Sequence, residues 1–208
     1  MLQIIPALLV AITVVIQCLA VQMSRYRLSR MNARPPHHGL ALMSGMLAAA
    51  AIILRLYQSD SAVGVLFMTI MTGCMTLMTL TDAASCRLPR PFTIMYLISG
   101  SAFRLWQGDW LTGLCSAGFW FLLLLLFRQY TSYRRKTETI GLGDVFLIAG
   151  IAIWSPPGDI PWIVATAAGG ALLYLWCNRQ RRITRELPFG PFLCASQYAF
   201  TFYPGGLW

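Results

Sequence analysis

Two aspartates at the edges of apolar stretches are the residues of this sequence best suited to chemistry. Asp82 directly follows the apolar residues 62–81, and Asp144 opens the apolar stretch 144–154. Two carboxyl groups that lie close together in low-dielectric surroundings cannot both ionise easily, so such a pair shares a proton. The ionised member can take a proton from water while the protonated member polarises a carbonyl group. This is the chemistry by which paired aspartates hydrolyse amides.

Two glycines precede the second aspartate. Gly141 and Gly143 belong to the sequence Gly-Leu-Gly-Asp at residues 141–144. Glycine lets the backbone bend and lets another chain approach it closely, which would suit a substrate held in an extended conformation. We therefore predict that Gly141 and Gly143 shape the site around the aspartates.

Two other roles would also account for these acids. Asp144 at a helix start could cap that helix and interact favourably with its dipole. The same dipole disfavours Asp82 at the C-terminal end of a helix, so a capping role explains Asp144 better than Asp82. Proton or ion coupling across a membrane is the other role, because an acid at the edge of a membrane segment is costly and is therefore a functional candidate.

The elements that must position the aspartates are membrane helices. The hydrophobic fraction of the chain is 57% and the charged fraction 11%, whereas soluble domains carry roughly 25% charged residues. Lipid cannot satisfy free peptide groups, so the spans must be helical. The first apolar run, 2–21, has no basic residue before it and no convincing cleavage site after it, so we interpret it as a retained span. We predict an all-α, polytopic membrane helix bundle.

Polar loops divide the chain into about eight predicted transmembrane segments, which would use its whole length at roughly 20 residues per span. They cover residues 2–21, 39–57, 62–81, 91–106, 110–127, 144–154, 160–177 and 188–203. We predict one integral membrane domain over 1–208, with 1–39 as the first span and a short basic loop, and 40–208 as the helix bundle that carries the site. The sixth segment is too short for a simple span. We expect it to start within the preceding loop or to be half-buried in protein.

Basic residues are concentrated in alternate loops. These loops contain fourteen of the 16 lysines and arginines, and the other set of turns contains none. Basic loops are typically cytoplasmic. We therefore predict that Asp82 and Asp144 lie at the same depth on the cytoplasmic side and that both termini lie on the opposite side. Arg55 and Arg104 fall inside segments near that opposite side, where their side chains could extend outward to water.

Composition also argues against several classes of function. The net charge is +9, but no basic stretch is long enough to form a nucleic-acid-binding domain. The six cysteines include no C-x-x-C pair, which argues against a zinc ribbon and a disulfide framework. His37 and His38 are adjacent without further ligands, so we interpret them as loop residues and predict no metal and no cofactor.

Three stretches of the sequence resemble the type IV prepilin peptidases, the bacterial members of the GxGD membrane aspartic proteases. The first, DAASCRLP over residues 82–89, has an aspartate followed seven residues later by the proline of a Leu-Pro pair. The second is the GLGD sequence at 141–144. The third, ELPFGPFL over 186–193, is similar to the Pro-Phe-Gly-Pro stretch that opens the last span of that family. The resemblance covers roughly residues 40–208.

The resemblance implies that Asp82 and Asp144 are the catalytic pair of an aspartic endopeptidase and that Gly141 and Gly143 shape its site. Such an enzyme removes the short basic leader of type IV prepilins or pseudopilins at the cytoplasmic face of the bacterial inner membrane. Both termini would then be periplasmic, and the partners would be these substrates and the lipid bilayer. Residues 188–191 would be a rigid structural neighbour of the site.

The sequence also departs from the family pattern. Phe146 stands where the family commonly has lysine, and Arg90 stands where asparagine or aspartate often follows the proline. Larger members carry a cysteine-rich insert after the first span, linked to N-methylation of the cleaved pilin. The corresponding loop here is short and has no cysteine, which does not favour zinc binding or N-methyltransferase activity.

Two different classes of function remain as alternatives to a peptidase. A proton-coupled transporter would use the same acids as a relay, and it would need polar groups at mid-membrane depth. A non-enzymatic membrane component of a pilus or secretion machine would carry them only as boundary residues. Exchange of either aspartate for asparagine should be tolerated in that last case.

Overall fold

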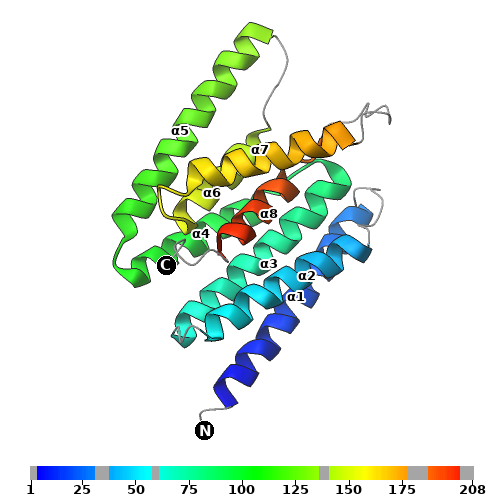
Figure 1. Cartoon of the computed structure of the whole chain (residues 1–208), viewed down its shortest axis with the longest axis vertical. Helices are drawn as coiled ribbons and strands as arrows, with labels where there is room; N and C mark the ends of the chain where they lie inside the picture. The colour runs from blue at the N-terminus through cyan, green and yellow to red at the C-terminus, as the bar shows by residue number, and fades with distance from the viewer. Residues whose placement is uncertain (1–3, 31–37, 58–60, 136–140, 178–186, 202–208) are drawn as a thin grey trace.

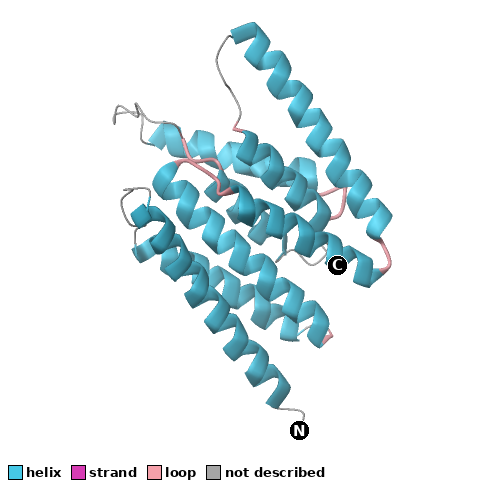
Figure 2. Ribbon diagram, turned by 180° about the vertical axis from the view of Figure 1, so that it is seen from behind, coloured by secondary structure: helices cyan, strands magenta, loops and turns pink. Residues whose placement is uncertain are grey.

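The computed structural model describes residues 4–30, 38–57, 61–135, 141–177 and 187–201, and within these ranges it contains eight α-helices and no strand (Figures 1 and 2). The helices are α1 (Ile4–Arg30), α2 (His38–Tyr57), α3 (Ala62–Ser85), α4 (Arg90–Gln107), α5 (Trp110–Arg135), α6 (Leu142–Trp154), α7 (Ile160–Cys177) and α8 (Gly190–Thr201). The all-α prediction is confirmed, and each predicted segment corresponds to one helix.

Four of the described helices, α1, α3, α5 and α7, are long and apolar enough to cross a membrane. Helices α2 and α6 contain shorter apolar stretches of 15 and 13 residues, at 39–53 and 142–154. These features agree with the predicted helical membrane bundle. The predicted number of about eight spans stays a prediction.

Helix α3 lies at the centre of the bundle, where it packs against α1, α2, α4 and α8 (Figure 1). Most of its side chains are buried, and several of them are polar. The hydroxyl oxygens of Thr13 and Thr69 are 3.1 Å apart, and Gln17 Nε2 donates to Thr72 Oγ1 at 3.1 Å. Side-chain hydrogen bonds of this kind join helices in membranes, because lipid offers no partner for a polar group.

Helix α6 is short and starts at Leu142, within the predicted loop, as the sequence predicts for the sixth segment, and it is more deeply buried than the half-buried alternative. Its 13 residues extend about 20 Å at 1.5 Å per residue. Almost every side chain beyond its first turn is buried, and the helix packs mainly on α4 and α5. Glycine permits that approach: a Cβ added to Gly150 would lie 2.6 Å from Tyr96 Cδ1. Trp154 Nε1 also donates to the Tyr96 carbonyl at 3.1 Å.

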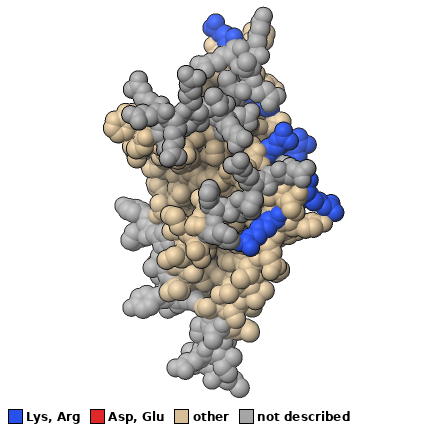
Figure 3. Space-filling model, turned by 90° about the vertical axis from the view of Figure 1, so that its right-hand side faces the viewer, with Lys and Arg blue, Asp and Glu red and all other residues tan. Residues whose placement is uncertain are grey.

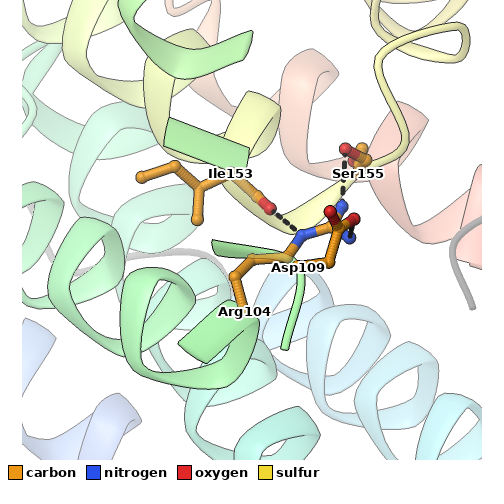
Figure 4. Close-up of polar contacts among 4 residues, drawn as sticks. All are labelled: Arg104, Asp109, Ile153 and Ser155. Carbon is orange, nitrogen blue, oxygen red and sulfur yellow. Dashed lines mark hydrogen bonds and ion pairs between the residues drawn. The ribbon is translucent and has the colours of Figure 1, made fainter. Parts of the chain in front are cut away.

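Arg104 fixes the other end of α6 (Figure 4). Its Nε donates to the Ile153 carbonyl at 2.8 Å and its Nη2 to the Ser155 carbonyl at 3.0 Å, while Nη1 lies 3.4 Å from Asp109 Oδ2. Only 7% of Arg104 is exposed, so the expectation that this side chain extends outward to water is wrong. The carbonyls at a helix C-terminus have no hydrogen-bond donors within the helix, and the Arg104 guanidinium donates to two of those at the end of α6. The side chain of Arg55 lies outside the described residues.

Two helices continue beyond the apolar stretches that predict them. Helix α1 reaches Arg30 and α5 reaches Arg135, although loops are predicted after residues 21 and 127. Neither extension contains proline or glycine, and arginine is a good helix former, so nothing stops the helix where hydrophobicity ends. The C-terminal part of α5 projects beyond its neighbours in Figure 1.

Basic side chains gather on part of one face of the bundle. On the face drawn in Figure 3, the visible lysine and arginine side chains lie between the top of the molecule and its middle. The C-terminal end of α3 and the N-terminal end of α6 lie toward the upper end of the molecule in Figure 1.

Candidate active site

Asp82 lies in the last turn of α3. The helix continues through Ser85, so the predicted end at residue 81 is four residues too early. It ends at Cys86, which adopts the left-handed conformation at φ 50° and ψ 31° and donates its N–H to the Asp82 carbonyl at 2.7 Å. Only 4% of Asp82 is exposed. The aspartate is therefore a buried helical residue, held at the rim of the bundle by the tight turn that follows it.

The N-terminus of α8 meets this carboxyl group. The Gly190 N–H donates to Asp82 Oδ2 at 2.8 Å. A Cβ added to Gly190 would stand 2.7 Å from the same oxygen, so no other residue fits there without displacing the carboxylate. Sequence reasoning treated residues 188–191 as a rigid neighbour and missed this contact. A glycine between two prolines at a helix start was the available signal.

Asp144 lies in the first turn of α6, three residues after Gly141. Gly141 occupies the N-cap position and makes no side-chain cap, so Asp144 is not itself the N-cap. The Asp144 side chain turns back toward that glycine, because a Cβ on Gly141 would lie 3.2 Å from Asp144 Oδ2. A carboxylate in the first turn is favoured by the helix dipole, so position in the helix alone does not distinguish a structural from a chemical use of Asp144.

Gly143 brings the start of α6 against the loop that follows Asp82. A Cβ on Gly143 would lie 2.8 Å from Leu88 Cβ. The absence of a side chain therefore lets the two segments that carry the aspartates lie side by side. The close contact with Leu88 supports the prediction that Gly143 shapes the site. That Gly143 also lies close to a substrate stays a prediction.

Both aspartates line one cavity of about 1170 Å³. They are near enough for their negative charges to act on each other. The remaining lining comes from the loop after α3, the first turns of α4 and α6, the segment before α8, and single residues of α5 and α7. It consists of Cys86, Arg87, Leu88, Arg90, Thr93, Ile94, Leu124, Gly141, Leu142, Gly143, Phe146, Ile148, Val164, Leu187 and Phe189. The four residues predicted from the sequence therefore all border the same space.

A comparison with known protein families shows the family to which this chain belongs. Residues 69–176 match the Type IV leader peptidase family. The chain belongs to this family. The matched range includes Asp82, Asp144 and the two glycines before Asp144, and it ends before α8.

Two relatives of this leader peptidase family member are each called "Prepilin leader peptidase/N-methyltransferase", from Burkholderia pseudomallei strains 1026b and K96243. Each is 33% identical over 175 residues, which cover 79% of this chain and 53% of the relative. The chain thus spans about half the length of the curated relatives that it matches. No solved structure matches it.

Phe146 marks a point where this leader peptidase family member departs from the pattern expected of its family. Its ring packs on Phe121 of α5, with the centroids 5.3 Å apart, and it lines the cavity. An aromatic contact between α5 and α6 therefore stands where a lysine is commonly expected. Arg87 and Arg90 line the same cavity and are exposed, so the positive charge at this site comes from the loop after α3 and the first residue of α4.

The described residues contain no group of three or more histidine, cysteine, aspartate or glutamate side chains placed to hold a metal ion. His37 lies outside the described residues, and His38, predicted as a loop residue, is the first residue of α2.

Proposed function

We propose that this chain is an aspartic endopeptidase that removes the leader of type IV prepilins or pseudopilins, with Asp82 and Asp144 activating the attacking water. The observation that carries the proposal is the meeting of these two carboxyl groups in one cavity. They come from the end of α3 and the start of α6. Membership of a leader peptidase family and the names of the relatives support the choice of substrate.

The proposed reaction starts with one carboxyl ionised and the other protonated, because two like charges cannot easily coexist in a partly buried cavity. The ionised carboxyl takes a proton from water as the water oxygen attacks the scissile carbonyl carbon. The protonated carboxyl gives its proton to the carbonyl oxygen, which yields a tetrahedral diol. The carboxyl group that received the water proton then passes it to the amide nitrogen, and its partner takes a proton back from a diol hydroxyl. The C–N bond breaks, and a carboxylic acid and an amine are released.

The cavity suits a peptide that continues into a hydrophobic helix. Besides the polar residues near the aspartates, its wall includes apolar side chains, among them the exposed Ile94 and the half-buried Leu124. We propose that the leader peptide bond lies at the aspartates just before the hydrophobic helix of the prepilin, which stays in the membrane.

The proposed location is the bacterial inner membrane, with the site at its cytoplasmic face and both termini in the periplasm. The supporting observations are the apolar helices and the bias of basic residues to alternate loops, which is typical of cytoplasmic loops. We propose only the peptidase activity for this chain. The N-methyltransferase in the relatives' name is said of proteins of which the match with this chain covers 53%.

The two other classes of function lead to different expectations. A proton relay would draw on polar groups inside the bundle, such as Gln17, Thr69 and Thr72. These side chains hydrogen-bond across the contact of α1 with α3, which accounts for them as helix–helix contacts. A non-enzymatic component would tolerate replacement of the acids.

The test is co-expression with a candidate prepilin, followed by the mobility shift that marks loss of the leader. The unaltered chain should process the prepilin, and the Asp82→Asn and Asp144→Asn variants should leave it uncleaved while accumulating to the same level in the membrane. Asp109→Asn is the matched control, since Asp109 is half exposed, pairs with Arg104 and does not line the cavity. Full processing by either cavity variant would rule out the proposed function.

A further inference from the structure

The opening turn of α8 presents one backbone donor to the cavity carboxyl of α3. Proline has no N–H, so Pro188 and Pro191 offer none. The N–H groups of Phe192 and Leu193 both donate to the Phe189 carbonyl. The Gly190 N–H donates instead to Asp82 Oδ2 at 2.8 Å, over a separation of 108 residues in sequence.

The glycine is needed there for space rather than for an unusual backbone conformation. Gly108 is the glycine with positive φ in the described chain, so Gly190 adopts a conformation open to other residues. Its missing side chain matters because a Cβ would stand 2.7 Å from Asp82 Oδ2 and 3.3 Å from Asp82 Cβ. Both residues are buried, so an added methyl group would push the Asp82 carboxyl group away from the Gly190 N–H and toward the cavity that it lines.

The surroundings of the two carboxyl groups differ. A backbone N–H that donates to a carboxylate favours its charged form, and such charge-assisted bonds are stronger than neutral ones. Asp82 has this donor, and the positive end of the α8 dipole offsets the negative end of α3. Asp144 has the dipole of its own helix, but no hydrogen bond reaches its carboxyl group from the described residues. In a buried site the direct bond outweighs the partial charge of a helix end.

We propose that Gly190 is a positioning residue that keeps Asp82 as the ionised, proton-accepting member of the pair and leaves the shared proton on Asp144. In the reaction proposed above, Asp82 would therefore take the proton from water and Asp144 would protonate the scissile carbonyl. This inference rests on the proposed function and adds to it the separate role of each carboxyl group.

Other charged and titratable groups also face the pair. They are Cys194 of α8, and Cys86, Arg87 and Arg90 along the cavity wall. On α1, the Arg27 guanidinium stacks on Phe92, 4.8 Å from the centroid of its ring. Arginine stays protonated throughout the pH range of an assay. The arginines therefore shift the whole pH profile by a constant amount, and the Gly190 donor is the contact that a single substitution can remove.

The inference is tested by the pH dependence of kcat/KM for prepilin cleavage. Gly190→Ala displaces the Asp82 carboxylate from its donor, so Asp82 should take a proton more readily and the acid limb of the profile should move to higher pH. We expect a displacement of about one pH unit, with kcat/KM about tenfold lower on that limb and partial recovery at higher pH. Gly169→Ala is the matched control, because nothing lies within 4 Å of a Cβ at that helical glycine, and its profile should equal that of the unaltered chain.

A second variant keeps the inference testable if Gly190→Ala does not fold. Glycolic acid incorporated at position 190 replaces the N–H by an ester oxygen without adding a side chain, and the same displacement of the acid limb is expected. A Gly190 variant that cleaves with an unmoved acid limb, whatever its overall rate, overturns the positioning role. If Asp82→Asn itself cleaves normally, the proposed function fails first. If Asp82→Asn is inactive and the Gly190 profile is unmoved, this inference alone fails.

Discussion

Gly143 packs so closely on Leu88 that a Cβ on the glycine would lie 2.8 Å from the leucine Cβ. The contact joins the start of α6, which carries Asp144, to the loop that leaves α3 just after Asp82. The distance between the two carboxyl groups therefore depends on the absence of one side chain. Sequence resemblance points to this glycine as part of a motif, and the structure supplies a physical reason for it.

Gly143→Ala should push α6 away from the loop and separate the two aspartates. A misplacement of about 1 Å at a reacting centre can lower a rate about 100-fold, and we expect a loss of that order in kcat/KM for prepilin cleavage. The double variant Gly143→Ala, Leu88→Gly removes Leu88 Cβ, the atom nearest the added methyl group, and should recover part of the loss. Full activity in the Gly143→Ala single variant would contradict the packing role.

Cys86→Gly should stabilise the chain. Cys86 is the one described residue other than glycine with positive φ, at 50°, and the left-handed conformation costs a residue with a Cβ roughly 1–2 kcal/mol. We expect the free energy of unfolding in detergent to rise by about 1 kcal/mol. Cys86→Ala is the control, since it keeps the Cβ and the strain. Equal stability of the two variants would show that the backbone conformation is not the cause.

Arg104→Met should destabilise the bundle at the end of α6 opposite Asp144. It would leave the carbonyls of Ile153 and Ser155, which now accept hydrogen bonds at 2.8 and 3.0 Å, without their donor. An unsatisfied buried polar group costs about 1–3 kcal/mol, so thermal unfolding in detergent should show a loss of about 2–4 kcal/mol. Arg134→Met, at an exposed position of α5, should change little. An Arg104→Lys variant as stable as the unaltered chain would show that the forked geometry of the guanidinium is not needed.

Much of the fold follows from composition and charge alone. The apolar stretches predict the eight helices of the described residues. The distribution of basic residues predicts that Asp82 and Asp144 lie near the same end of the bundle. Helix ends are harder to predict from the sequence, because α1 and α5 continue through polar residues with good helix propensity to Arg30 and Arg135. Hydrophobicity marks where lipid ends, and the helix does not stop there.

The contacts that define the site could not be read from the sequence. The bond from Gly190 to Asp82 joins residues 108 positions apart, and local patterns carry no information on which helix end meets which side chain. Arg104 shows the same limit. An arginine inside an apolar segment suggests a side chain that reaches water, but this one donates to the backbone carbonyls of Ile153 and Ser155 at the end of α6. Which surface of a helix faces a neighbour depends on the packing of the whole chain.

The central claim is that Asp82 and Asp144 act as one catalytic unit, and a double-mutant comparison tests it most directly. The purified protein in detergent would be assayed for kcat/KM on a synthetic prepilin peptide, as the unaltered chain, Asp82→Asn, Asp144→Asn and the double variant. Groups that act as a unit give grossly non-additive losses. We expect each single variant to lose at least about 1000-fold and the double variant to lose no more than the worse single one. Losses that multiply in the double variant, or near-normal cleavage by either single variant, would contradict the account.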